Sequence, residues 1–166
     1  MIACLDVHYF DGRAHAAAIV CEEWTSSQSV AEYTADCTEV AAYCAGEFYR
    51  RELNPLLSVI AKIQQSVNTF VIDGYCHLSI DRASGLGVHL QTALANQVLV
   101  VGVAKNRYRS TTHAYELFRR ESRRPLFVTS IGMDYAAAAR NVDAMAGEFR
   151  IPKLLKAVDR LARSER

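Results

Sequence analysis

Three acidic residues are placed where they could act together on one ligand. Asp6 ends the apolar run of residues 1–5, and Asp73 ends a second apolar run, residues 69–72. Burying a carboxylate at the end of a strand is costly unless something neutralises it, so such a residue is often a metal ligand, a catalyst or a helix cap. Together with Glu52, these acids would suit a divalent cation such as magnesium or manganese, which prefers carboxylate oxygens.

Each acid also has a purely structural explanation. Asp6 could accept backbone hydrogen bonds at a strand end, and Asp73 could form a turn with Gly74, as Asp-Gly pairs often do. Glu52 falls in the first turn expected for a helix, where the helix dipole alone would stabilise its charge. If these explanations hold, the chain is a structural or small-molecule-binding α/β domain, and the three acids lie apart.

The order of the expected elements bears on this choice. A strand pattern at 1–10, the hairpin turn signal Asp11-Gly12 and strand patterns at 13–21 and 29–37 predict an antiparallel meander. Helix and strand patterns then alternate, which is typical of parallel strands covered by helices. The later expected elements are a helix at 50–63, a strand at 69–72, a helix at 84–95, strands at 98–103 and 126–131, and helices at 135–149 and 153–163.

This order resembles the ribonuclease H-like fold. We therefore predict an α/β protein whose mixed sheet, an antiparallel meander continued by parallel strands, is flanked by helices. One domain over residues 1–166 fits the length of the chain and its hydrophobic content of 51%. The ends of the first and fourth strands are neighbours in such a sheet, which would bring Asp6 and Asp73 to one ion. Glu52 would approach from the start of the first helix, where Pro55 is tolerated only in the first turn.

The composition indicates the cellular compartment in which the protein is expected. No stretch reaches the length of a membrane span, and the N-terminus lacks the charged and then apolar order of a signal peptide. The five cysteines form no C-x-x-C pair and leave one unpaired under any disulfide scheme, which suits a reducing compartment. We therefore expect a cytoplasmic protein with no membrane partner. The sequence does not define its oligomeric state.

Most basic residues follow Lys105, although the formal net charge is only +1. Lys105 itself ends an apolar strand, so its ammonium could hold a phosphate beside the acids, or it could be a solvated lysine. The density of arginines after it could follow the phosphate backbone of a nucleic acid, or form a solvated surface. These arginines are Arg107, Arg109, Arg119, Arg120, Arg123 and Arg124.

Six short motifs follow one another along the chain. They are D-V-x-Y at 6–9, Y-x-x-G-x-x-x-x-R-E at 43–52, D-G at 73–74, G-x-x-x-H at 85–89, G-V-A-K at 102–105 and a tail at 149–162. Their order resembles that of the endonuclease V family, which cuts nucleic acid near deoxyinosine or inosine. Each motif alone is weak, but six in the right order indicate the family and its fold.

The resemblance implies a role for each of several residues. Asp6, Asp73 and Glu52 would hold a magnesium or manganese ion, and Lys105 would support the phosphate, so that all four would be catalytic. The backbone of glycines would approach a modified base closely, because glycine has no side chain to keep the base away. The glycines that match the family here are Gly46, Gly74 and Gly85.

The chain departs from the family at two histidines. One of them follows the family's D-G segment and works beside the cut, and its position falls here on Ser79 or Ile80. His77 is nearby and could replace it through a bulge. The second family histidine corresponds to Met133. Losing a positioned acid–base residue commonly costs about a hundredfold in rate, so these departures could silence the site.

The wedge that parts the strands in the family is also altered. Tyr43 is retained and could stack on a displaced base, or it could pack against Phe48. The prolines that flank this tyrosine in the family are Ala42 and Ala45 here. Two hypotheses follow: a metal-dependent endonuclease acting near deoxyinosine, inosine or another damaged base in DNA or RNA, or a silent homologue that only binds nucleic acid.

Overall fold

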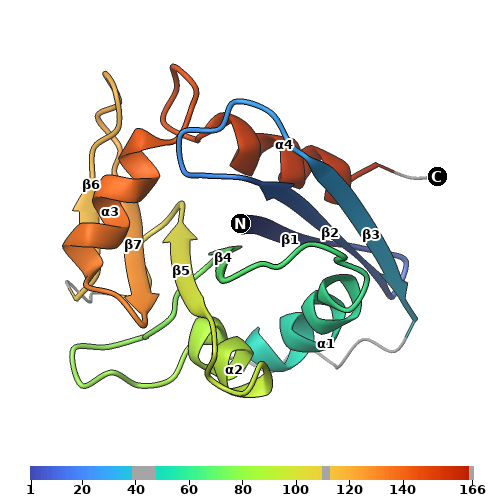
Figure 1. Cartoon of the computed structure of the whole chain (residues 1–166). Helices are drawn as coiled ribbons and strands as arrows, with labels where there is room; N and C mark the ends of the chain where they lie inside the picture. The colour runs from blue at the N-terminus through green and yellow to red at the C-terminus, as the bar shows by residue number, and fades with distance from the viewer. Residues whose placement is uncertain (39–47, 110–112, 165–166) are drawn as a thin grey trace.

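A computed structural model describes residues 1–38, 48–109 and 113–164 of the chain. One mixed sheet of seven strands, in the order β3-β2-β1-β4-β5-β7-β6, forms its centre (Figure 1). The strands are β1 (Ile2–Phe10), β2 (Arg13–Cys21), β3 (Ala31–Cys37), β4 (Thr69–Asp73), β5 (Leu99–Ala104), β6 (Tyr115–Leu117) and β7 (Leu126–Ile131). The helices are α1 (Phe48–Ile60), α2 (Leu86–Ala93), α3 (Tyr135–Ala144) and α4 (Lys153–Ala162).

The predicted ribonuclease H-like arrangement is confirmed, with one change in strand direction. β1, β2 and β3 form the antiparallel meander, and β4 and β5 continue it as parallel neighbours of β1. β7 and β6 then pair antiparallel, so the parallel part of the sheet stops at β5. Asp11 and Gly12 have φ of 46° and 75°, the conformation that a two-residue hairpin turn needs.

Two elements differ from the sequence prediction. β6 was not expected, because three residues are too short to show an alternating pattern. The helix expected over 135–149 ends at Ala144, and Met145 is already extended with φ −57° and ψ 143°. Gly147 follows with φ 116°, a conformation that favours glycine. The chain between α3 and α4 is therefore a turn and not a longer helix.

Alternate residues of the central strands enter two separate cores. Ala3, Leu5 and Ile72 pack with residues of α1 and α2 on one face. Cys4 and Val71 pack with residues of α3 and α4 on the other. Because successive strand side chains point to opposite faces, Asp6 and Asp73 follow Cys4 and Val71 onto the α4 face.

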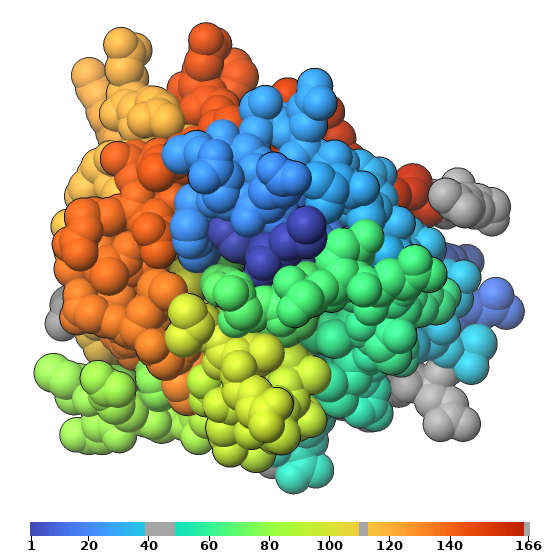
Figure 2. Space-filling model, viewed as in Figure 1, coloured from blue at the N-terminus to red at the C-terminus, as the bar shows by residue number. Residues whose placement is uncertain are grey.

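The first residues of the chain are enclosed by the segment that precedes β4. The Asn68 N–H donates to the Met1 carbonyl at 3.1 Å, and the terminal ammonium donates to the Ser66 carbonyl at 3.3 Å. Figure 2 shows these dark-blue residues beside the green segment that leads into β4. These contacts help to fix the register of β1 against β4, which decides where the acids meet.

The described cysteines behave as the composition predicted. Cys4, Cys21, Cys37 and Cys76 are all free thiols, and all but Cys37 are buried. Among the described residues, no helix is long and apolar enough to span a membrane.

Candidate active site

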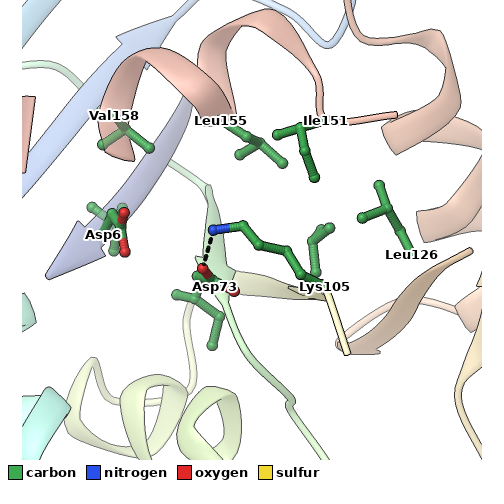
Figure 3. A pocket seen from close by; sticks show the side chains of 10 residues that line it. Asp6, Asp73, Lys105, Leu126, Ile151, Leu155 and Val158 are labelled. Carbon is green, nitrogen blue, oxygen red and sulfur yellow. Dashed lines mark hydrogen bonds and ion pairs between the residues drawn. The ribbon is translucent and has the colours of Figure 1, made fainter. Parts of the chain in front are cut away.

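The register of β1 and β4 brings Asp6 and Asp73 to the same level of adjacent strands. Leu5 pairs with Ile72, so the next residue of each strand is an aspartate. The Val7 N–H donates to Asp6 Oδ1 at 2.9 Å and orients that carboxylate. Figure 3 shows both aspartates below α4, beside a small apolar pocket that Leu155 and Val158 help to line. The sequence prediction that these two acids are neighbours is therefore met by the strand pairing.

Lys105 joins this pair from the end of β5. Its ammonium lies 2.7 Å from Asp73 Oδ2 and 3.7 Å from Asp159 Oδ1 (Figure 3). Burial alone would lower the pKa of Lys105, but the hydrogen bond with Asp73 and the charges of Asp159 and Asp6 raise it above its usual value. Lys105 is therefore a charged group held at the acids, as its position after the strand predicted.

Asp159 is an acid that the sequence prediction did not place in the site. It lies on α4, and Arg163 holds it through two hydrogen bonds of 3.1 and 3.2 Å. Burial would raise the pKa of Asp159, but the bonds from Arg163 and the charge of Lys105 hold it below its usual value. The available signal was a charge at position 159 one turn after Leu155, on the otherwise apolar side of an amphipathic helix.

Glu52 approaches from α1 and is only 7% exposed. A hydrogen bond from Tyr9 of β1 holds its carboxylate. Pro55 lies in the second turn of α1, and not in the first turn as predicted, so it leaves the Arg51 carbonyl without its usual helical donor. The Tyr9 hydroxyl lies 3.0 Å from that carbonyl and within reach of it. The hydroxyl has one proton, so Tyr9 lies next to both acceptors but donates to only one of them at a time.

The carboxyl groups influence one another strongly. Burial, followed by the charge of Asp73, raises the pKa of Asp6 to about 7. Burial also raises the pKa of Glu52 to about 7; the hydrogen bond with Tyr9 lowers this pKa, and the charges of Asp6 and Asp73 add to the rise. Such mutual repulsion shows that the three acids share one neighbourhood, which contradicts the hypothesis that they lie apart.

These pKa values predict that the metal-free protein loses stability as the pH rises from about 4 to about 7. The unfolded carboxyl groups titrate near pH 4, so between this value and about 7 the folded protein binds more protons than the unfolded chain. Asp6→Asn removes one of these groups and should stabilise the protein at pH 8 by about 2 kcal/mol. Thermal unfolding in EDTA at pH 5.5 and pH 8 measures both effects.

The matched control for this experiment is Glu22→Gln. Glu22 is an exposed acid directly after β2, at the end of the sheet opposite to Asp6. Its replacement should leave the melting temperature unchanged at both pH values. Equal melting temperatures of Asp6→Asn and the wild-type protein at pH 8 would contradict the raised pKa of Asp6.

The donor set fits a hard divalent cation, although the cage is incomplete. Within 1–38, 48–109 and 113–164, no three His, Cys, Asp or Glu side chains are arranged as a ready-made metal site. Asp73 is bonded to Lys105, and Glu52 is bonded to Tyr9, so the expected sharing of one cation by all three carboxylates is not preformed. Magnesium needs only one or two carboxylates, since water completes its shell. Asp6, Glu52 and Asp73 as metal ligands remain a prediction.

A cavity of about 420 Å³ opens beside the acids. Asp73 and Lys105 form one side of it, and Gly74 and Gly85 contribute backbone to its wall, as predicted. A Cβ at position 85 would lie 2.6 Å from the Tyr75 carbonyl oxygen, so only glycine fits there. Tyr43 and Gly46, the other residues predicted to contact nucleic acid here, lie outside the described residues.

Aromatic side chains complete this cavity. Tyr49 is one of its walls and stacks on His89 of α2, with ring centroids 3.6 Å apart and planes inclined by 11°. Tyr75 lines it as well, and its hydroxyl donates to the Asn106 carbonyl at 2.8 Å. The cavity therefore offers flat apolar surfaces close to carboxylates and a cation. The sequence prediction missed Tyr49, because a tyrosine at the start of a helix carries no signal of its stacking partner.

His77 does not lie beside the acids, as its proposed role would require. It is buried, its Nδ1 lies 2.7 Å from the Tyr135 hydroxyl, and its carbonyl accepts a hydrogen bond of 2.6 Å from His113. Burial and the charges of Arg82 and His113 lower its pKa. The His77 ring therefore contacts α3 and not the acids. Met133 packs against the core beneath α3 and α4.

The arginines after Lys105 do not act as one surface. Arg107 pairs with Glu116 and lies over the Phe127 ring, and Arg109 lies over Tyr108. Arg119 is fully buried and donates to three backbone carbonyls, so its expected place on a solvated or phosphate-binding loop is wrong. Contact of Arg107 and Arg109 with nucleic acid stays a prediction.

The fold and this site define a ribonuclease H-like α/β protein with a carboxylate cluster at the edge of its sheet. The chain belongs to the endonuclease V family, whose model, named Endonuclease V, matches residues 1–145. No curated protein sequence matches the chain.

Solved structures of the family are similar over almost the whole chain. Endonuclease V from Streptomyces avermitilis is 26% identical with a TM-score of 0.79, covering 98% of this chain and 79% of its own. Endonuclease V from Ciona intestinalis, solved with a 24mer DNA containing an inosine followed by a ribo-adenosine, is 18% identical with a TM-score of 0.78, covering 98% and 83%. Endonuclease V from Bacillus subtilis is 16% identical with a TM-score of 0.75, covering 98% and 78%.

Proposed function

We propose that the protein is a metal-dependent endonuclease that cuts a phosphodiester close to deoxyinosine, inosine or another damaged base in DNA or RNA. The observation that carries this proposal is the placement of Asp6 and Asp73 at the same level of adjacent strands, with Lys105 bonded to Asp73 beside a cavity of about 420 Å³. The family supports the reaction, and the inosine-containing DNA of the Ciona intestinalis structure supports the substrate. A role in nucleic-acid repair follows.

In this proposal each residue has a definite task. Asp6 and Asp73 hold a magnesium or manganese ion, Glu52 completes the shell or orients a water, and Lys105 binds the phosphate. The bound ion would lower the pKa of a coordinated water and neutralise charge on the phosphate. Lys105, which is paired with Asp73 in this structure, would supply a positive charge for a phosphate oxygen. The modified base enters the cavity between Tyr49 and the glycine backbone.

The direct test is cleavage of matched single strands. The protein is incubated with Mn²⁺ and strands that are identical except for inosine or guanosine at one position, in both DNA and RNA. We expect cutting close to inosine, no cutting in EDTA, and none by the double variant Asp6→Ala/Asp73→Ala. Product that is independent of the two aspartates, or absent altogether, would remove the proposed activity.

A silent homologue that binds nucleic acid is the second candidate. It is favoured by the contacts of His77, which go to Tyr135 and His113, and by Met133 at the place of the second family histidine. Binding of the inosine strand without cleavage in Mn²⁺ or Mg²⁺ distinguishes this candidate from the endonuclease. The four free cysteines among the described residues support a cytoplasmic setting for either.

Tyr49 is predicted to bind the base that enters the cavity. Stacking of a base on an aromatic side chain contributes enough free energy for its loss to weaken binding by about tenfold. We therefore expect Tyr49→Leu to raise the Kd for an inosine-containing strand by about this factor, measured by fluorescence anisotropy. Tyr115→Leu is the matched control, since Tyr115 is a partly exposed tyrosine on the edge strand β6. An unchanged Kd of Tyr49→Leu would exclude this stacking.

A further inference from the structure

Phe149 is an aromatic residue that the fold exposes near the candidate active site. Its side chain is 71% exposed, which is unusual for a phenylalanine, and it lies in the turn between α3 and α4. Nothing in the roles proposed above uses it. An exposed aromatic ring that is costly in water is a common sign of a binding surface.

The turn that carries Phe149 is fixed by buried and charged contacts. Arg119 has no exposed surface and donates to the Phe149 carbonyl at 2.6 Å, and also to the carbonyls of Met145 and Gly147. Arg120 donates to the Gly147 carbonyl as well, at 3.2 Å. The Lys153 N–H closes the turn onto the Ala146 carbonyl at 2.8 Å. The backbone under Phe149 is therefore held in place before any ligand arrives.

A second cavity connects Phe149 to the acids. It measures about 220 Å³, and Phe149, Lys156, Lys105 and Asp159 are among the residues that line it. Lys105 also borders the cavity of about 420 Å³ that Tyr49 lines. The two cavities thus share Lys105, and each is lined by one of its acidic partners, Asp73 in the larger cavity and Asp159 in the smaller. A chain of nucleotides long enough to fill one could continue into the other.

The charges around Phe149 suit a phosphate backbone. The Lys156 ammonium lies 5.8 Å from the centroid of the Phe149 ring. Lys105 and Arg150 line the same cavity, and Asp159 is the acid among its lining residues. An aromatic face beside cationic groups is the arrangement with which proteins bind single-stranded nucleic acid, because bases stack on the ring while the cations attract phosphates.

We propose that Phe149 and Lys156 form a second nucleotide-binding site, in which an unmodified base of the substrate strand stacks on Phe149 and its phosphate lies at Lys156. This site rests on the proposed function and extends it, since the nucleotide lies in a cavity that shares Lys105 with the cavity proposed for the modified base. It holds the strand at two points with the scissile phosphodiester between them. Stacking tolerates any base, so the site contributes affinity and alignment without reading sequence.

The test uses single-stranded DNA with one inosine and with one abasic residue moved along the strand. Binding is measured by fluorescence anisotropy in Ca²⁺, and gels confirm that the strand stays intact. Phe149→Ala should bind the intact strand about tenfold more weakly than the wild-type protein. One abasic position should weaken wild-type binding by a similar factor and should have no effect on Phe149→Ala, because the stacking partner of that base is already missing.

Three further variants complete the experiment. Phe149→Trp keeps an aromatic face and should retain wild-type affinity, and Lys156→Met should weaken binding and reduce its dependence on salt. Val30→Ala replaces an exposed apolar residue beside the opposite edge of the sheet and should behave as the wild-type protein. Wild-type affinity of Phe149→Ala, or equal sensitivity of both proteins to every abasic position, would overturn the second site.

The outcome separates this site from the proposed activity. One result would be that the Phe149→Ala variant binds all strands as the wild-type protein does and still cuts close to inosine. This result would exclude the second site and leave the proposed endonuclease activity standing. If the protein binds the strands but does not cut them, the effect of the abasic position should still depend on Phe149. Stacking of a base does not require catalysis. Failure of the wild-type protein to bind any strand would overturn both.

Discussion

Replacing Asp6 by asparagine is expected to reduce cleavage of an inosine-containing strand by at least about a hundredfold. Asparagine keeps an oxygen that can accept the 2.9 Å hydrogen bond from Val7, but it removes the negative charge. In the proposed function, that charge would be the contribution of β1 to holding a cation next to Asp73. Single-turnover rates in Mn²⁺ with excess enzyme measure the effect on the chemical step, free of product release.

The stability of the same variant serves as an internal control. Asp6→Asn should melt at a higher temperature than the wild-type protein in EDTA at pH 8, because the pKa of Asp6 is raised to about 7. Lost activity therefore could not be ascribed to unfolding. Glu22→Gln, which removes an exposed acid at the other end of the sheet, should cut at the wild-type rate. Wild-type rates of Asp6→Asn would show that the charge of Asp6 has no part in the reaction.

The second large effect is expected for Arg119→Met. Arg119 is fully buried, and methionine would fill much of its volume while leaving the carbonyls of Met145 and Phe149 without their donor and the Gly147 carbonyl with Arg120 alone. Buried carbonyls without partners are costly, so the free energy of unfolding should fall by about 3 kcal/mol. Urea denaturation followed by circular dichroism measures this change.

Arg123→Met is the matched control for that experiment. Arg123 is an exposed arginine of the same stretch, and its replacement should change the free energy of unfolding by no more than about 0.5 kcal/mol. Arg119→Lys should also be destabilised, because one ammonium cannot replace a planar guanidinium that reaches several carbonyls. A loss below about 1 kcal/mol in Arg119→Met would show that the turn before α4 does not depend on this arginine.

Local patterns were sufficient to predict the central sheet and two of its acids. The turn at Asp11-Gly12 sets the hairpin register, and apolar runs before Asp6 and Asp73 mark strands buried on both faces. Parallel pairing of β1 with β4 then follows from the alternation of helix and strand. Because these signals are all local in the sequence, the proximity of Asp6 and Asp73 could be inferred without a structure.

The parts that were missed depend on contacts between distant segments. Asp159 enters the site only because α4 packs across β1, and no pattern around it states which side chains it will meet. Arg119 looks like its exposed neighbours in the sequence, since its burial depends on a turn almost thirty residues later. β6 is too short for an alternating pattern, and its antiparallel partner β7 carries no signal of direction.

The hydrogen bond between Tyr9 and the Arg51 carbonyl has a consequence for motion within the site. It joins residues 42 positions apart in the sequence, one next to the strand segment that carries Asp6 and the other next to Glu52 on α1. Helix termini and loops open locally far more often than whole domains unfold. This bond connects α1, which contains a proline, to the sheet. Local opening of α1 can therefore move Glu52 away from the sheet only after the bond breaks. The bond therefore restrains the position of Glu52 relative to the strand that carries Asp6.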